Sequence, residues 1–465
     1  MPGKRPEKGE PTGAEPPDPA GQWGLSGTAS AFTRTVNTPC WSALSSLAAG
    51  EKAVFMNAIR VWFVTGRLPP EYSGAGRNDS LLGVSCARQN IEVTLLAPRS
   101  RNMQLPPSQD GVPVYWLPGG VSILTKISRI IYTLRAFELL GSPRVIRIRG
   151  FSLEHALLLL LVKWRRAGVP VVVQPAMLGG DDPESLSKKR FGNFQVRQLL
   201  KADAIFAMNV QIAHQLLKRN YPREAIYRTR NPVSGKHFVS RSPEERRSVR
   251  GGLGIPEDSV LVATVGVILP RKRQAFVTEG FCLALEQNGS ERKVLVHIGP
   301  RSTDGFAAGR PDHGQRSLSE ERSVAEIVHR FESSTIVSFL GEREDIPTVL
   351  GAVDILVHAS KEEGEANVVN EAAAAGVALV IPTSSIYDDQ VPAGYPWRFD
   401  VDSAADLARV LAHLMKDSSI RMEAGQALRE HARQTRSEDA VGKQYAEMLR
   451  AVVEHHGRKG AHGGR

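Results

Sequence analysis

The chain has 465 residues, 42% of them hydrophobic and 23% charged, which is the composition of a globular protein with room for two sizeable α/β domains. Its formal net charge of +10 favours an anionic partner, but the basic residues form no long run or RNA-type motif, so nucleic acid is not the expected partner. The three cysteines exclude a disulfide framework or a zinc cluster, and with no recognisable signal peptide they indicate a reducing, cytoplasmic compartment.

The two ends of the chain are predicted to be disordered tails. Residues 1–57 are rich in Pro, Gly, Ser and charged residues, and residues 456–465 have a similar composition. Between them, apolar runs alternate with helical patterns, which is typical of parallel βαβ units. The longest apolar run, 156–162, is far shorter than the roughly 20 residues that span a bilayer, so it predicts a buried helix.

Two sets of apolar runs predict two Rossmann-like domains. The first domain, 58–238, begins with RVWFVT and continues through IEVTLLA, VPVYWLP, RVIRIRG, VPVVVQP and ADAIFAMN. The second, 239–415, begins with SVLVATVG and continues through KVLVHIG, TIVSFLG, VDILVHA and VALVIP, and helices are expected over 416–455. Ligands of such sheets bind beyond the carboxyl ends of the strands, so a cleft between the two domains is the expected site.

The loop after the first predicted strand is the first candidate for the site. Within residues 66–76, Gly74 and Gly76 bracket Ala75, and their missing Cβ atoms would let the backbone approach a ligand closely. A plain turn that closes the strand would have the same sequence, because a lone GxG is a weak signal.

The loop after the first strand of the second domain is basic. Its residues Arg271, Lys272 and Arg273 stand where a diphosphate would need positive charge, with lysine as a point charge and arginine as a bidentate fork. The alternative is a solvated basic loop.

The third candidate loop, SKEEGEANVVNEAAAAG, opens a small-residue helix. The amides of Asn367, Val368 and Val369 would lie at the helix start, where free N–H groups and the helix dipole favour an anion. Glu371, one turn further, could accept both hydroxyls of a ribose, and Glu363 could accept hydroxyls of a second sugar. Either glutamate alone would also suit an exposed or helix-start position, but the strand–loop–helix context favours a sugar-nucleotide site.

In this order, the motifs resemble those of the retaining group 1 glycosyltransferases of the GT-B fold. The resemblance covers roughly residues 58–450 and includes the Gly-rich loop, PRKRQ, FLGEREDIPTVLGAVDILVHAS, an E-x7-E spacing and NPVSGKHF. It implies two Rossmann-like domains facing across a cleft, the first for the acceptor and the second for the donor nucleotide, with the last helix crossing back to the first domain. It also implies that Lys272 binds donor phosphate, Glu371 the ribose and Glu363 the donor sugar.

The chain departs from the family pattern on the donor side. Val267 stands where the family usually has an arginine, and Arg271 or Arg273 is the expected substitute. The pair Glu365-Ala366 replaces a Gly-rich pair after the first glutamate, so altered contacts with the donor sugar are expected there.

The acceptor side departs as well. Where the family often has a histidine near the reacting sugar, RVIRIRG offers Arg147 and Arg149, with His155 a few residues later. Arg149 is therefore a candidate acceptor-binding residue. Asp181 and Asp182 are two more, because they could bind acceptor hydroxyls, although they could equally cap the next helix.

The function that the resemblance implies is transfer of a sugar from a nucleotide-sugar donor to a hydroxyl acceptor with retained configuration. A glycan or lipid-linked glycan of polysaccharide or glycoconjugate biosynthesis is the expected acceptor, and Glu363 and Lys272 are the candidate catalytic residues. No metal or other cofactor is expected, because the basic loop would neutralise the diphosphate and no DxD motif is suitably placed. Two alternatives remain: a catalytically silent GT-B scaffold subunit, and a UDP-sugar epimerase, which would need a histidine constellation.

The segment TKISRIIYTLRAFELLG, residues 125–141, mixes basic and bulky apolar residues at helical spacing. Such a helix can lie on an anionic membrane leaflet, so peripheral contact with the inner face of the membrane is one expectation. The other is an ordinary amphipathic helix of the first domain.

Overall fold

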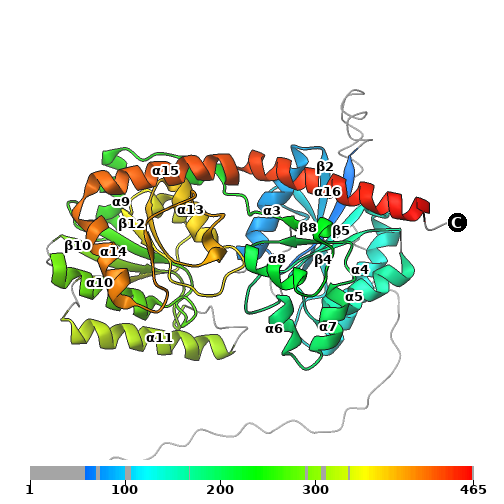
Figure 1. The fold of residues 1–465 in the computed structure, drawn as a ribbon, viewed down its shortest axis with the longest axis horizontal. Helices are drawn as coiled ribbons and strands as arrows, with labels where there is room; N and C mark the ends of the chain where they lie inside the picture. The colour runs from blue at the N-terminus through cyan, green and yellow to red at the C-terminus, as the bar shows by residue number, and fades with distance from the viewer. Residues whose placement is uncertain are drawn as a thin grey trace, which may run out of the picture. The chain divides into compact units, whose positions relative to one another are not determined.

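The computed structural model describes residues 58–462 apart from 70–73, 100–105, 167, 289–291, 305–310 and 333–335. These residues form two α/β lobes, which Figure 1 shows in blue to green and in green to orange. We call them the N-lobe, with the strands of residues 59–228, and the C-lobe, with the strands of residues 260–399. The tail predicted over residues 1–57 lies outside the described residues.

The N-lobe contains an eight-stranded sheet of order β3-β4-β2-β1-β5-β6-β7-β8, parallel except for β3. Its strands are β1 (Ile59–Val64), β2 (Ile91–Pro98), β3 (Ser108–Gln109), β4 (Val112–Leu117), β5 (Val145–Arg149), β6 (Val171–Gln174), β7 (Ala204–Ala207) and β8 (Ile226–Arg228). Its helices are α3 (Gly74–Ala87), α4 (Ile123–Leu139), α5 (Leu153–Arg165), α6 (Pro183–Ser187), α7 (Gly192–Leu199), α8 (Val210–Leu217) and the 3-10 helix η1 (Arg223–Ala225).

The C-lobe contains a six-stranded parallel sheet of order β11-β10-β9-β12-β13-β14. Its strands are β9 (Val260–Val265), β10 (Lys293–Ile298), β11 (Val337–Gly341), β12 (Ile355–Val357), β13 (Ala378–Pro382) and β14 (Arg398–Phe399). The remaining helices are η2 (Gly235–Phe238), α9 (Pro243–Gly252), α10 (Gln274–Asn288), α11 (Pro311–Arg330), α12 (Ile346–Leu350), α13 (Asn367–Ala375), η3 (Ser385–Tyr387), α14 (Ala404–Lys416), α15 (Ser418–Arg436) and α16 (Glu438–His462).

Every apolar run predicted from the sequence contains a strand. Parallel strands are covered by helices on both faces, so each reads as a nearly continuous apolar run. In β1, Val61 and Phe63 pack into one core with α3 and α16, whereas Trp62 and Val64 pack into the core on the opposite face. The predicted buried helix at 156–162 lies in α5. No helix in the described part of the chain is long and apolar enough to cross a membrane.

Both sheets reverse their strand order beside their first strand. In the N-lobe the chain runs from β1 outward through β2 and β4 and then returns to β5 on the other side of β1. In the C-lobe it runs from β9 through β10 and β11 and returns to β12. Ligands of open parallel sheets bind outside the carboxyl ends of the strands at such reversals. A ligand-binding site is therefore expected at the loops that follow β1, β5, β9 and β12.

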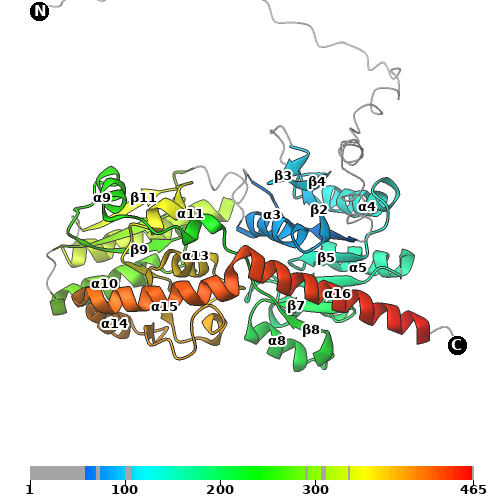
Figure 2. The same ribbon diagram turned by 90° about the horizontal axis from the view of Figure 1, so that it is seen from above.

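The last helix crosses from the C-lobe to the N-lobe, as the family resemblance implied. α15 packs on α13 and β13, and after Ser437 the chain continues as α16 along the N-lobe (Figure 2). Tyr445 and Leu449 of α16 belong to the same core as β1 and β2, and Gly442 packs so closely on α3 that an added Cβ would lie 2.5 Å from the Ser85 carbonyl oxygen. α16 continues to His462, so most of the segment predicted as a tail from residue 456 is helical. Arg458 near the end of this helix suits the negative end of the helix dipole.

Candidate active site

Glu363 is the centre of a cluster of charged side chains at the carboxyl edge of the C-lobe sheet. Its Oε1 atom lies 2.6 Å from Lys272 Nζ and 2.8 Å from Arg271 Nη1. The two cations are on the loop between β9 and α10, and Glu363 is on the loop between β12 and α13, so the strand reversal brings them together. Glu363 Oε2 has no partner among the described residues. One carboxylate oxygen is thus held by cations while the other is available.

The cluster carries a net positive charge. Burial raises the pKa of Glu363, but Lys272, a contact with His358 and Arg271 outweigh it and hold that pKa well below its usual range. Burial lowers the pKa of His358, whose Nε2 lies 3.5 Å from Glu363 Oε1, and so favours the neutral imidazole. Two cations therefore face one carboxylate, which suits an anionic ligand. His358 was not among the residues predicted from the sequence, although its position directly after β12 was a signal.

Arg273 does not join the predicted basic cluster. It adopts a left-handed backbone conformation, with φ of 60°. Its guanidinium stacks 3.9 Å from the ring centroid of Phe276 and donates to the Val401 carbonyl. The structure therefore corrects the prediction that three basic side chains gather here: two do.

The start of α13 offers two backbone N–H groups. Ala366, the residue before the helix, provides no side-chain cap, and Val369 N–H donates to the Ala366 carbonyl at 3.1 Å. The prediction that Val369 contributes a free amide is corrected accordingly. The N–H groups of Asn367 and Val368 have no partner within the described chain. Free amides at a helix start, aided by the helix dipole, form an anion site.

Glu371 lies one turn into α13 with its carboxylate unpaired in the described part of the chain. The side chain is half-buried, and Asn367 lies on the same helix face because the two are four residues apart. Burial raises the pKa of Glu371 to about 7, against a weaker opposing effect of Arg77 on α3. A carboxylate that burial has partly removed from water, with no hydrogen-bond donor among the described residues, is costly unless a ligand supplies donors.

The glycines of the first loop belong to the start of α3. An added Cβ on Gly76 would lie 2.0 Å from the Arg67 carbonyl oxygen, so the close approach there is to the loop after β1. An added Cβ on Gly74 would lie 3.2 Å from Asn367 Nδ2, and Ala75 between them is half-buried. Gly74 thus places the N-lobe next to the start of α13, whereas Gly76 serves packing within the N-lobe.

Hydrogen bonds hold residues 363–371, the segment predicted to bind a donor and called the donor loop below, against the N-lobe. Asn367 Oδ1 accepts from Asn78 Nδ2 at 2.7 Å and from Asn231 Nδ2 at 3.0 Å. Asn209 Nδ2 donates to the carbonyls of Glu363 and Gly364 at 3.1 and 2.9 Å. A Cβ on Gly364 would lie 2.0 Å from the Ala176 carbonyl oxygen, so only glycine fits there.

Two family models match consecutive parts of the chain. The model described as "Glycosyl transferase 4-like domain" matches residues 73–232, and that described as "Glycosyl transferases group 1" matches residues 245–435. The chain belongs to the group 1 glycosyltransferases. It is thus a glycosyltransferase, and the match to the second model contains the loops that carry Lys272, Glu363 and Glu371.

Known proteins support the family and the fold. A D-inositol 3-phosphate glycosyltransferase from Saccharomonospora viridis is 25% identical over 406 residues, which cover 80% of this chain and 88% of that protein. HepE from Anabaena, solved with UDP and glucose, superimposes with a TM-score of 0.66 at 15% identity over 84% of this chain and all of that one. A sucrose-phosphate synthase from Thermosynechococcus elongatus gives 0.66 at 14% identity over 85% of this chain and all of that one. The fold of this glycosyltransferase is GT-B.

The N-lobe side of the glycosyltransferase contains a buried polar network around Asp79 of α3. Asp79 Oδ1 accepts from Arg147 Nη1 and from Arg149 Nη1, both at 2.7 Å, and its other oxygen accepts from Thr65. Burial raises the pKa of Asp79, but the two arginines and Thr65 outweigh it and lower that pKa. Arg149 also donates to Asn231 Oδ1 at 3.3 Å.

This network corrects the prediction for Arg149. The side chain is 5% exposed and paired with Asp79, so it is a link between the N-lobe strands and Asn231 rather than a group that faces an acceptor. His155, the other basic candidate, contacts Ser152 Oγ, and burial lowers its pKa. Asp79 had no sequence signal, because its partners lie 14, 68 and 70 residues away.

Asp181 and Asp182 organise the loop before α6. Asp182 Oδ1 accepts from the N–H groups of Glu184 and Ser185, so the capping alternative is confirmed for it. The Asp181 carboxylate accepts from the N–H groups of Phe151, Ala176 and Met177, and burial raises its pKa to about 6 in spite of them. The carboxylates of both residues thus accept from backbone N–H groups, and the alternative role in binding acceptor hydroxyls stays a prediction.

We expect Asp182→Ala to lower the free energy of unfolding by about 1–2 kcal/mol, because it removes a helix N-cap, and to leave nucleotide affinity unchanged. Denaturant unfolding and calorimetric titration with UDP measure the two quantities. Glu184→Ala, an exposed acid on the same short helix, is the control that should change neither. Unchanged stability together with a raised acceptor KM would favour the acceptor role.

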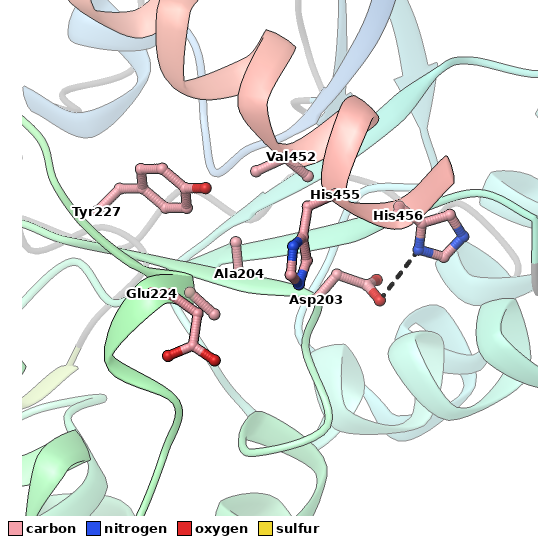
Figure 3. A pocket seen from close by; sticks show the side chains of 8 residues that line it. Asp203, Ala204, Glu224, Tyr227, Val452, His455 and His456 are labelled. Atoms are coloured by element: carbon pink, nitrogen blue, oxygen red, sulfur yellow. Dashed lines mark ion pairs between the residues drawn. The ribbon is translucent and has the colours of Figure 1, made fainter. Parts of the chain in front are cut away.

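A small pocket elsewhere is not part of the site. It lies where α16 meets β7 and β8, and Figure 3 shows His456 turned toward Asp203, with Nδ1 3.4 Å from its carboxylate. Asp203 precedes β7, so the pocket is at the amino edge of the sheet, opposite the loops described above. No group of three or more His, Cys, Asp or Glu residues that could hold a metal occurs in the part of the chain that the structure describes.

Proposed function

We propose that this enzyme transfers a sugar from a nucleotide-sugar donor to a hydroxyl of a glycan or lipid-linked glycan, with retained anomeric configuration. The observation that carries the proposal is the start of α13, where two free amides stand one turn before the unpaired carboxylate of Glu371. Amides of this kind suit a diphosphate, and a free carboxylate suits the vicinal hydroxyls of a ribose. HepE, which shares the fold, was solved with UDP-glucose as well as with UDP.

In this proposal each group at the carboxyl edge of the C-lobe has a separate task. Lys272 and Arg271 stabilise the negative charge that develops on the departing nucleoside diphosphate. Glu363 Oε2 accepts a hydroxyl of the transferred sugar, while Oε1 stays on the cations. Two cations and two amides supply the charge that a metal would otherwise provide, so we propose that no metal is needed. We assign no protein nucleophile.

A screen of nucleotide sugars tests the proposal. Purified protein is titrated with UDP, GDP and ADP by calorimetry, and the matching sugar nucleotides are then assayed for hydrolysis and for transfer to lipid-linked glycan acceptors. We expect one nucleotide to bind and its sugar derivative to be turned over. Binding without any turnover would favour the silent scaffold, and release of an epimerised sugar would favour the epimerase.

We further propose that α4 contacts an anionic lipid surface. Ile123, Leu124 and Trp164 are 75, 76 and 74% exposed, which is unusual for side chains of this size. Lys126 and Arg135 are exposed on α4 as well, and α4 is tied to α5, which carries Trp164, by an ion pair. Apolar side chains beside cations suit an anionic leaflet.

We expect the double substitution of Ile123 and Leu124 by serine to weaken vesicle binding at least about tenfold, because two large apolar side chains no longer enter the lipid. Flotation with phosphatidylglycerol vesicles measures it. Met422→Ser removes a similarly exposed apolar side chain from α15 and should have no effect. Equal binding to phosphatidylglycerol and phosphatidylcholine vesicles, or none to either, would contradict the proposal.

A further inference from the structure

Glu365 lies between the two glutamates of the donor loop, but its side chain is directed into the protein. Its Oε1 lies 2.6 Å from Arg436 Nη1 and accepts from Asn370 Nδ2 at 3.1 Å, while its Oε2 accepts from the Asn231 backbone N–H at 2.7 Å. Both charged side chains are 2% exposed. The sequence predicted altered donor-sugar contacts at this position, whereas the carboxylate is fully used by protein groups.

The partners of Glu365 lie where the chain passes between the lobes. Asn231 follows β8, the last strand of the N-lobe, and Arg436 ends α15, just before α16 enters the N-lobe. The two passages touch, because Val233 N–H donates to the Arg436 carbonyl at 2.8 Å and Val233 forms a bridge with Ser437. Glu365 therefore connects the donor loop to both passages at once.

The Arg436 guanidinium depends on Glu365 to balance its buried charge. Among the described residues its Nε atom has no hydrogen-bond partner, and the Nη1 contact with Glu365 is an ion pair without the alignment of a hydrogen bond. Only Nη2 donates elsewhere, to the Asp389 carbonyl. A buried pair of this kind adds little net stability compared with apolar side chains, but removal of one partner leaves an uncompensated charge. The Glu365–Arg436 pair therefore adds little to the stability of the fold. We look instead to its position between the lobes for its role.

We propose that Glu365 and Arg436 are positioning residues of the donor site. The pair fixes the start of α13 relative to the two passages, so that the amides of Asn367 and Val368 stand in place for the phosphates of a nucleotide. Glu365 is two residues from Asn367, whose side chain is held by Asn231 as well, so a shift of Glu365 moves these amides directly. The nucleotide in this inference rests on the proposed function, whereas the placement of Glu365 and Arg436 does not depend on it.

The test compares Arg436→Met, the double variant Glu365→Gln/Arg436→Met, and Arg436→Lys. Arg436→Met should lower the unfolding midpoint, and the double variant should recover it, because no buried charge is then left alone. The affinity for UDP or GDP, whichever the wild type binds, should fall about tenfold in Arg436→Met and in the double variant, because a small misplacement of binding groups is costly. Arg436→Lys keeps the charge and should retain more affinity than Arg436→Met.

Hydrogen exchange of the amides of residues 366–371 gives a second measurement that needs no ligand. Exchange should be faster in Arg436→Met and in the double variant, since local opening at the helix start becomes easier. Arg250→Met is the matched control: Arg250 is a buried arginine paired with Asp354 at the opposite edge of the C-lobe sheet. It should lower the unfolding midpoint without changing either nucleotide affinity or exchange at 366–371.

Wild-type affinity and wild-type exchange at 366–371 in the double variant would overturn the inference. So would an equal change in Arg250→Met, because the pair would then act only through general stability. If the wild type binds no nucleotide, the proposed function fails, and exchange at 366–371 alone decides whether the pair positions the loop.

Discussion

Glu371→Ala is expected to lower kcat/KM for the donor about a hundredfold or more, because two hydrogen bonds to a charged acceptor, worth about 1.5–3 kcal/mol each, are lost. The carboxylate has no partner within the described chain, so the substitution breaks no protein contact and the loss is specific to the ligand. Steady-state kinetics with the donor identified in the screen measure it. Glu423→Ala, an exposed acid on α15, is the control and should behave as wild type.

The raised pKa of Glu371 has two consequences with opposite signs. Donor binding needs the carboxylate, so nucleotide affinity should weaken as the pH falls through about 7, the pKa in the folded protein. The ligand-free fold favours the protonated form, so this group's contribution to stability is full at low pH and is lost as the pH rises through 7. Glu371→Gln should therefore raise the unfolding midpoint at pH 8 but not at pH 4.

A wild-type kcat/KM in Glu371→Ala would remove Glu371 from the donor site. A nucleotide affinity that does not change between pH 6 and pH 8 would show that its protonation plays no part in binding.

Lys272→Met is expected to reduce kcat about 10²–10³-fold, the usual effect of removing one group that stabilises charge in the transition state. In the proposed reaction the diphosphate leaves with additional negative charge, which Lys272 would offset. The fold should persist, because Arg271 still pairs with Glu363 at 2.8 Å and the buried carboxylate is not left alone. Single-turnover kinetics separate this effect on chemistry from an effect on product release.

Lys361→Met is the matched control for Lys272→Met. Lys361 is on the loop that carries Glu363, but its side chain is 46% exposed and pairs with Asp402 instead. Its removal should leave kcat unchanged. An equal fall in both variants would indicate that general positive charge near the site, and not Lys272 itself, supports the reaction.

Much of the fold could be predicted because parallel strands that are buried on both faces appear in the sequence as nearly continuous apolar runs. Runs such as VLVATV and ALVIP are apolar on both faces, and their order along the chain is that of two doubly wound sheets. The strands that were missed, β3, β8 and β14, have two or three residues each, too few for a pattern. The helix over residues 456–462 was missed because its glycines and charges resemble those of a tail.

The site was predictable to the extent that it lies in continuous loops. Lys272, Glu363 and Glu371 could be named as candidates because the loops that carry them follow predicted strands and match the family motifs. The same reasoning grouped Arg273 with Arg271 and Lys272, whereas its backbone is left-handed and its side chain stacks on Phe276. The sequence left Asp181 and Asp182 open between two roles. Only the positions of nearby N–H groups in the structure show that the Asp181 carboxylate holds the loop and that Asp182 caps α6.

The sequence alone determined the two sheets, the order of the loops at their carboxyl edges and the chemical character of those loops. These depend on local pattern, since apolar runs, glycines and charges act within a few residues of one another. Only the tertiary structure decided which charges meet: Asp79 with Arg147 and Arg149, and Glu365 with Arg436 and Asn231. Such pairs join residues 68 or more positions apart, and the energy that selects them comes from burial, which no local spacing records.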